Sequence, residues 1–136
     1  MRWPSLETDF WDLESAEDRA AESPDSFWIP ARVDREAVQP GNLVKLLFRI
    51  EAEQPDGSAA VFVERMWVLV TERLDGACVG LLANQPGSFD PADGVYLARG
   101  AEVPFRPEHV IDIAEAPGEY IEEMRGITPT RRWPRS

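Results

Sequence analysis

The feature of this sequence that most constrains its fold is an alternating run of apolar and polar residues from 43 to 50. Successive side chains of a β-strand point to opposite faces, so every second residue of such a run shares one face. Turn signals stand on both sides, Gln39-Pro40-Gly41-Asn42 before the run and Gln54-Pro55-Asp56-Gly57 after it. The run therefore predicts a strand whose buried face consists of Val44, Leu46, Phe48 and Ile50.

Further strands are expected up to residue 113, because short apolar segments alternate there with turn residues. These segments are 27–29, 61–71, 77–83, 102–105 and 110–113. The segment 61–71 is apolar on both faces, which predicts cover on both sides. Asp75-Gly76 predicts a type I′ hairpin turn, and Gly80 predicts the close approach of another backbone. Five or six short strands favour a small, strongly bent antiparallel sheet or a partly open barrel.

The two ends of the chain differ from this centre. Residues 8–22 have apolar residues at helical spacing and predict one helix that packs on the sheet through Phe10, Trp11 and Leu13. Residues 119–125 predict a helical turn, and the tail from residue 128 is expected to be loose. We therefore expect a single mainly β (α+β) domain over 1–136. It comprises an acidic helical segment (1–26), a β core (27–113) and an extension with a basic tail (114–136).

Composition excludes several classes of protein. Disulfide scaffolds need paired cysteines, and Cys78 is the only cysteine. Zinc and iron–sulfur centres need clusters of Cys and His, so neither a metal nor another cofactor is expected. The sequence has no apolar run of the ~20 residues that cross a bilayer, and its first residues lack the apolar stretch of a signal peptide. These features predict a cytoplasmic protein that does not contact membranes.

The formal net charge of −11 argues against a nucleic-acid partner, because such binding depends on neutralising phosphates with Lys and Arg. Two interpretations of the acidic excess stay open. It either serves solubility through self-repulsion or attracts a basic protein partner. The last twelve residues carry four arginines and no acidic residue, so they form a basic tail.

Five stretches together resemble an uncharacterised family of small bacterial proteins, a domain of unknown function with a Met-Trp-Val strand and a Leu-x-Asn-x-Pro motif. They are Ala21-Glu22-Ser23-Pro24-Asp25-Ser26-Phe27, Gly41-Asn42-Leu43-Val44-Lys45-Leu46, Glu64-Arg65-Met66-Trp67-Val68, Gly80-Leu81-Leu82-Ala83-Asn84-Gln85-Pro86 and Pro107-Glu108-His109-Val110-Ile111-Asp112. The resemblance implies an SH3-like barrel. Because some relatives have been proposed as immunity proteins that neutralise secreted toxins, it also implies a protein-binding role without catalytic residues.

Arg65 and Trp67 are the first candidates for a binding surface, because they share one face of the expected strand. They could form a cation–π pair within a recognition patch, since Arg and Trp dominate interface hot spots. Alternatively, Trp67 belongs to the core and Arg65 extends beside it. Trp28 lies near a sheet edge, where an exposed ring would mark a partner site and a buried ring would anchor the segment.

Asn84, Pro86 and His109 form the second group of candidates. Asn84 either ends a strand by bonding its own backbone or points its amide into a pocket under the loop 84–101. His109, the only histidine, either satisfies a backbone group in the turn before the last strand or performs acid–base chemistry with Glu108 and Asp112.

Three functions therefore compete. The leading hypothesis is a non-catalytic protein-binding module, immunity-like in its most concrete form. The alternative is a small-molecule binder or hydrolase-type enzyme that uses the loop 84–101 as a lid over His109. A third possibility is self-association, and the expected state is a monomer or a weak homodimer.

Overall fold

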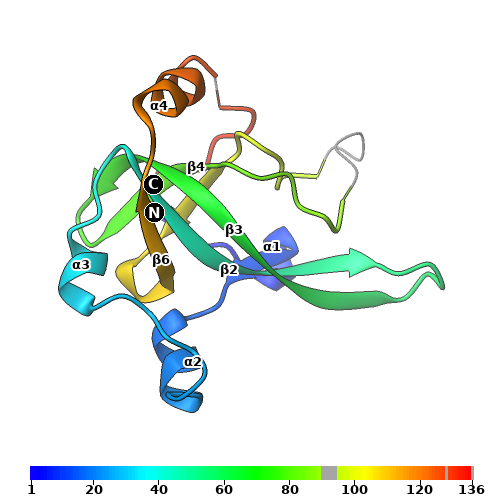
Figure 1. The fold of residues 1–136 in the computed structure, drawn as a ribbon. Helices are drawn as coiled ribbons and strands as arrows, with labels where there is room; N and C mark the ends of the chain where they lie inside the picture. The colour runs from blue at the N-terminus through cyan, green and yellow to red at the C-terminus, as the bar shows by residue number, and fades with distance from the viewer. Residues whose placement is uncertain (90–94, 128, 136) are drawn as a thin grey trace.

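A computed structural model describes residues 1–89, 95–127 and 129–135 (Figure 1). Six antiparallel strands form one sheet that curls into a half-barrel. The strands are β1 (Trp11–Leu13), β2 (Asn42–Glu53), β3 (Ala59–Leu74), β4 (Ala77–Leu82), β5 (Glu102–Phe105) and β6 (Val110–Glu115). The helices are α1 (Leu6–Asp9), α2 (Ala16–Glu22), α3 (Arg32–Glu36), the 3-10 turn η2 (Pro107–His109) and α4 (Gly118–Arg125).

The curl arises because β2 and β3 each pair with different neighbours along their length. The first half of β2 pairs with β6 and its second half pairs with β1, while β3 lies along its other edge. β3 leaves β2 after Leu69 and continues against β4, which pairs with β5. This arrangement confirms the predicted mainly β (α+β) fold with a small, strongly bent antiparallel sheet.

The core fills the concave face of the sheet, as the alternation in β2 predicts. Val44, Leu46, Phe48 and Ile50 have no exposed area. The turn before β2 is also confirmed, since Asn42 N donates to Gln39 O and Gly41 has a φ of +98°. A Cβ added to Gly80 would lie 2.5 Å from the carbonyl oxygen of Leu69, so β3 and β4 pack as closely as the sequence predicts.

The single helix predicted over 8–22 is wrong, because a strand interrupts it. Phe10 ends α1 in the left-handed conformation with a φ of +65°, and β1 then pairs with β2, Trp11 opposite Ile50. Ser15 begins α2 by accepting a hydrogen bond from Asp18 N at 3.2 Å. Trp11 is only 2% exposed, and the sheet buries this ring more completely than a surface helix would.

Three further predictions need correction. Residues 27–29 form an extended segment outside the sheet, and the helix α3 that follows was not foreseen. Only Gly76 of the Asp75-Gly76 turn has a positive φ, so the turn is not type I′. The first part of β3 lacks the expected cover, because β2 and β3 extend beyond the barrel as a hairpin arm (Figure 1). Val61 is consequently 52% exposed.

The tail is bound to the barrel and not loose over its described residues. Arg131 forms a parallel bridge with Ala101 beside β5, and its carbonyl accepts from Glu102 N at 2.9 Å. Trp133 is 3% exposed, and its backbone N donates to the buried carboxylate of Glu102. Arg135 donates to both oxygens of that carboxylate at 2.8 and 2.9 Å. Burial raises the pKa of Glu102, but the hydrogen bonds from Arg135 and Trp133, together with the charges of Arg135 and Arg132, outweigh it, so the pKa is lowered.

Arg135→Ala should therefore lower the free energy of unfolding by about 2 kcal/mol, because it leaves the buried carboxylate of Glu102 without its charged partner. Arg132→Ala is the matched control, since Arg132 is exposed and forms no ion pair among the described residues. Urea denaturation of both variants measures the difference. Equal stability of the two variants would contradict the proposed role of the pair, and Glu102→Gln should recover part of the loss in the Arg135→Ala background.

Candidate functional site

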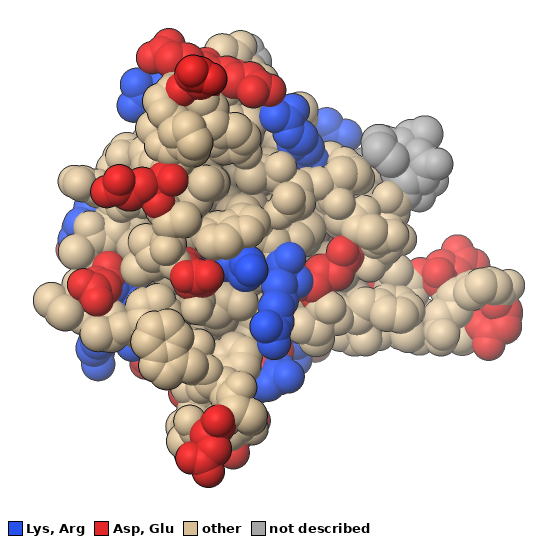
Figure 2. Space-filling view, in the orientation of Figure 1, with Lys and Arg blue, Asp and Glu red and all other residues tan. Residues whose placement is uncertain are grey.

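Aromatic and basic side chains gather on the convex face of β2 and β3, in what we call the outer-face cluster. Its members are Phe27, Trp28, Lys45, Arg65, Trp67 and Asp112. The strand register places Lys45 directly opposite Trp67 on one side and Asp112 on the other. Figure 2 shows Lys and Arg side chains in the middle of this face and acidic side chains around its periphery. The sheet therefore presents a small basic area on an acidic protein.

The cation–π contacts of the cluster differ from the Arg65–Trp67 pair that the sequence suggested. Lys45 Nζ lies 4.8 Å from the centroid of Trp67, which is half-buried. Arg65 Cζ lies 5.6 Å from the centroid of Phe27. The predicted Arg65–Trp67 pair is thus replaced by two cross-element contacts. Lys45 and Phe27 were missed as site residues, although the polar side of the β2 alternation could have indicated Lys45.

Trp28 is the most exposed large apolar residue described, at 82%. Its neighbours Phe27 and Ile29 pack against the buried residues Ala16, Leu47 and Ile111. Because side chains alternate in an extended segment, this anchoring turns Trp28 outward. Beside it lies a hollow of about 280 Å³ that Lys45, Arg65 and Asp112 also line. The structure thus brings Trp28 and Arg65 to one surface, next to Trp67.

Asn84 and Pro86 belong to the strand end and not to a pocket under a lid. Asn84 Oδ1 accepts from Trp67 N at 2.7 Å, which continues the β3–β4 pairing by one side chain. Pro86 is buried. The carboxylate of Glu64 then accepts from Gly87 N at 2.8 Å and from Ser88 Oγ at 2.7 Å. These bonds fasten the start of the loop to β3.

His109 is a buried residue of the η2 turn. Its Nδ1 accepts from Arg106 N at 2.9 Å, so the proton of the neutral ring is on Nε2. Burial lowers the pKa of His109 to about 4, with a further contribution from Arg106. The ring lies 6.2 Å from that of Trp3, whereas Asn84 bonds β3. The hydrogen bonds of the two residues therefore belong to separate parts of the fold.

The described part of the loop 84–101 lies over a different place from the one predicted. Phe89 and residues 95–97 line a hollow of about 540 Å³ together with the N-terminal segment and the tail. Trp11, Tyr96 and Trp133 pack there with ring centroids 5.6 to 6.0 Å apart. The middle of the expected lid, 90–94, lies outside the described residues. Phe89 and residues 95–97 of the loop therefore contribute to an aromatic wall at the chain ends.

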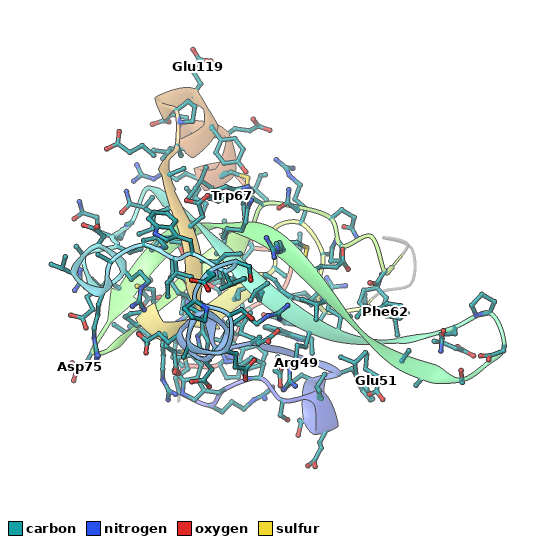
Figure 3. The ribbon with its side chains drawn as sticks, turned by 60° about the horizontal axis from the view of Figure 1, so that its bottom comes forward. Arg49, Glu51, Phe62, Trp67, Asp75 and Glu119 are labelled. Carbon is teal, nitrogen blue, oxygen red and sulfur yellow. The ribbon has the colours of Figure 1, made fainter. Side chains whose placement is uncertain are left out.

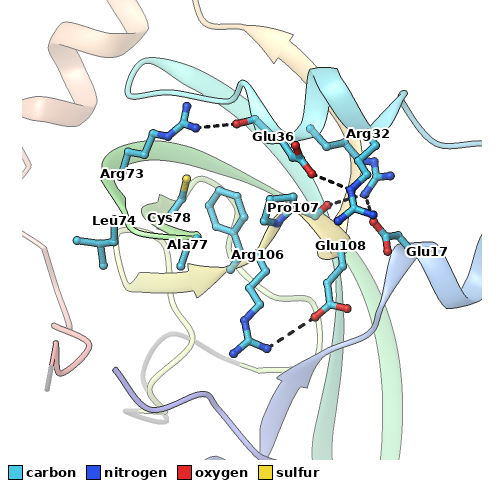
Figure 4. A pocket seen from close by; sticks show the side chains of 13 residues that line it. Glu17, Arg32, Glu36, Arg73, Leu74, Ala77, Cys78, Arg106, Pro107 and Glu108 are labelled. Atoms are coloured by element: carbon cyan, nitrogen blue, oxygen red, sulfur yellow. Dashed lines mark hydrogen bonds and ion pairs between the residues drawn. The ribbon is translucent and has the colours of Figure 1, made fainter.

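A charged hollow of about 460 Å³ lies between α2, α3 and the β3–β4 turn (Figure 4). Arg35, 6% exposed, donates there to Glu17 at 2.6 Å and to the carbonyls of Pro30 and Pro107. Arg73 donates to the carbonyls of Glu36 and Val38. Burial raises the pKa of the Cys78 thiol that lines this hollow, which disfavours a reactive thiolate. These arginines hold α3 against the barrel.

Comparison of the chain with protein-family models, curated proteins and solved structures found no match. Within the described ranges, no helix is long and apolar enough to span a membrane. No group of three or more Cys, His, Asp and Glu side chains in those ranges is placed to hold a metal ion. The fold and the site therefore define a small α+β protein. It is built on a curled antiparallel half-barrel and has an aromatic–basic cluster on its convex face.

His109 should make stability pH-dependent in mildly acidic solution. Its pKa is lower in the folded protein (about 4) than its ordinary value of 6.5, so the unfolded chain takes up the proton first. The contribution of the neutral ring is complete above pH 6.5 and is lost as the pH falls toward 4, amounting to about 3 kcal/mol at most. Urea denaturation of the wild type at pH 7 and pH 4.5 measures this loss.

His109→Gln is the matched control, because its amide oxygen can accept the Arg106 N–H but the side chain does not titrate. The loss of stability between pH 7 and pH 4.5 should be smaller in this variant than in the wild type. The same loss in both proteins would show that His109 is not the titrating group.

Proposed function

We propose that this chain is a non-catalytic protein-binding module that contacts its partner through the outer-face cluster. The observation that supports this most strongly is the exposure of Trp28, on a segment anchored by Phe27 and Ile29, beside Lys45 and Arg65 of the sheet. Exposed Trp and Arg side chains at the centre of a surface are the residues that most often dominate binding energy. The sheet holds Arg65 in place and the packing of Phe27 and Ile29 holds the segment of Trp28, which limits the entropy lost on binding.

The alternative enzymatic role has less support, because the residues it would need are engaged elsewhere. His109 accepts a backbone hydrogen bond and is neutral at pH 7 through its lowered pKa. Asn84 completes the pairing of two strands, and burial favours the protonated thiol of Cys78. The described loop residues line an apolar hollow at the chain ends. These side chains contribute to folding, which leaves surface contact as the better supported mode of action.

An immunity-like role in the cytoplasm is the most concrete form of this proposal. It rests on the resemblance of residues 21–113 to a bacterial family in which some relatives have been proposed as toxin-neutralising proteins. The net charge of −11 would attract a basic partner over long range. Lys45 and Arg65 would then select a partner with an acidic or carbonyl-rich spot inside its basic surface. In this proposal the net charge attracts the partner, and the local basic residues fix the position in which it binds.

The test is binding by the proteins encoded next to this gene, each co-expressed with the tagged chain and then titrated calorimetrically. The double variant Trp28→Ala, Arg65→Ala should weaken binding at least 100-fold, because each truncation removes about 2 kcal/mol at a hot spot. Phe10→Ala is the matched control, since Phe10 is an aromatic residue 59% exposed outside the cluster. It should bind as the wild type does.

Two results would overturn the proposal. One is that the wild type binds none of these proteins. The other is that the double variant binds as tightly as the wild type. Because Trp28 and Arg65 are both exposed, the double variant should fold normally, and circular dichroism checks this point.

A further inference from the structure

Among the residues that the structure describes, no strand covers one edge of the sheet along the hairpin arm. The backbone of Trp67 faces away from β2, since its N donates to Asn84 Oδ1 and its O accepts from Ala83 N. The β2–β3 register is regular from residue 59 to 69, so every second residue of β3 faces the same way. Val61, Val63 and Arg65 therefore present their N–H and C=O groups outward. Within the described ranges these groups have no hydrogen-bond partner.

Several other edges of the same sheet are covered. β1 lies along the second half of β2, and Glu51 N donates to Phe10 O just beyond it. The tail covers the start of β5 through the bridge between Ala101 and Arg131. β4 reaches β3 only from Val68 onward. The loop after β4 bonds β3 at Trp67 and Glu64, so within the described ranges residues 59–63 of the arm form an open stretch of this β3 edge.

The open segment lacks the residues that usually protect an edge strand. Lys, Pro and inward-pointing charges discourage pairing with another chain, but residues 59–63 are all apolar and contain no proline. Val61, Phe62 and Val63 are 52%, 41% and 50% exposed. β-Branched and aromatic residues are also those that pair best across strands. In Figure 3, Phe62 lies along this arm, apart from Trp67.

We propose that this edge pairs with the same edge of a second copy of the chain, antiparallel and around a twofold axis at Phe62. The outward backbone groups of Val61 then face those of Val63 in the copy, and both pairs of hydrogen bonds form. Phe62 lies opposite Phe62 of the copy in the close, non-hydrogen-bonded position on the same face. The sequence of the arm is therefore complementary to itself in this register.

Charge also favours a second copy over a charged foreign strand. Residues 59–63 carry no charge, and the register places Glu64 opposite Ala60 of the copy. No like charges face each other directly, although each chain carries −11. The general repulsion of two acidic chains remains and is screened by salt. Association should therefore be weak and should strengthen as salt concentration rises, the reverse of an interface held by ion pairs.

The experiment is sedimentation velocity of the full chain over a range of concentrations, at low and at high salt. The wild type should shift from monomer to dimer as concentration rises, with a lower dissociation constant at high salt. Val63→Pro should stay monomeric, because proline removes the outward N–H but leaves the bonds to β2 intact. Val63→Lys keeps the N–H yet adds a charge, and it tests the same edge if the proline variant does not fold.

Val33→Lys is the matched control, since Val33 is 71% exposed on α3. It should dimerise as the wild type does. Hydrogen exchange adds a second measurement, because the amides of Val61 and Val63 should become protected only at concentrations where dimer forms. A wild type that stays monomeric at all concentrations overturns the proposal. So does a dimer that Val63→Pro and Val63→Lys leave unchanged, or open-ended assembly in place of a dimer.

Discussion

The long antiparallel ladder between β2 and β3 is the interaction on which the rest of the structure depends. Its eleven paired positions align an apolar inner face with a charged and aromatic outer face. The remaining strands build on these two: β1 and β6 pair with β2, β4 pairs with β3, and β5 pairs with β4. The register between β2 and β3 thus determines which residues form the concave core and which form the outer-face cluster. A shift of the register by one residue would exchange the two faces.

The two ends of the chain complete the core on the side of the half-barrel that the β2–β3 ladder does not close. Trp11 enters the core from β1, and Trp133 enters it from the tail, with ring centroids 5.6 Å apart. Trp133 Nε1 donates to Arg2 O at 2.9 Å, and the guanidinium of Arg2 lies 4.2 Å from the Trp133 ring while it pairs with Asp9. Aromatic packing between distant segments therefore replaces the strand pairing that would close a complete barrel.

Local patterns in the sequence were sufficient for the centre of the fold. The alternation in β2, the glycine of its entry turn and the small residue at Gly80 each depend on one strand and its nearest neighbour. The same reasoning failed for Trp11 and the tail, because their positions depend on contacts across nearly the whole chain. A helical spacing around Phe10 could not reveal that β2 offers Trp11 a strand edge. The exposure of the arm was not predicted, because apolar residues are normally expected to be buried and the sequence does not show whether another segment covers them.

For the candidate site, sequence reasoning found Trp28, Arg65 and Trp67 but not the contacts among them. Lys45 faces Trp67 because of the strand register. The register depends on how two strands pair, which the sequence of one strand alone does not determine. Asn84 and His109 were ambiguous for a related reason. Each has one hydrogen bond that defines its role, and in both cases the partner is a backbone N–H that the sequence does not mark.

The contact between Arg2 and Trp133 spans 131 positions of the chain and has a consequence for synthesis. On a ribosome, the strands from β2 to β6 emerge before the segment that completes their packing. Trp11 therefore lacks its packing partner, the Trp133 indole, until residue 133 has left the exit tunnel. In nascent chains that lack residue 133, the aromatic face of the half-barrel would remain exposed to solvent. Exposed apolar surface of this kind is what chaperones bind.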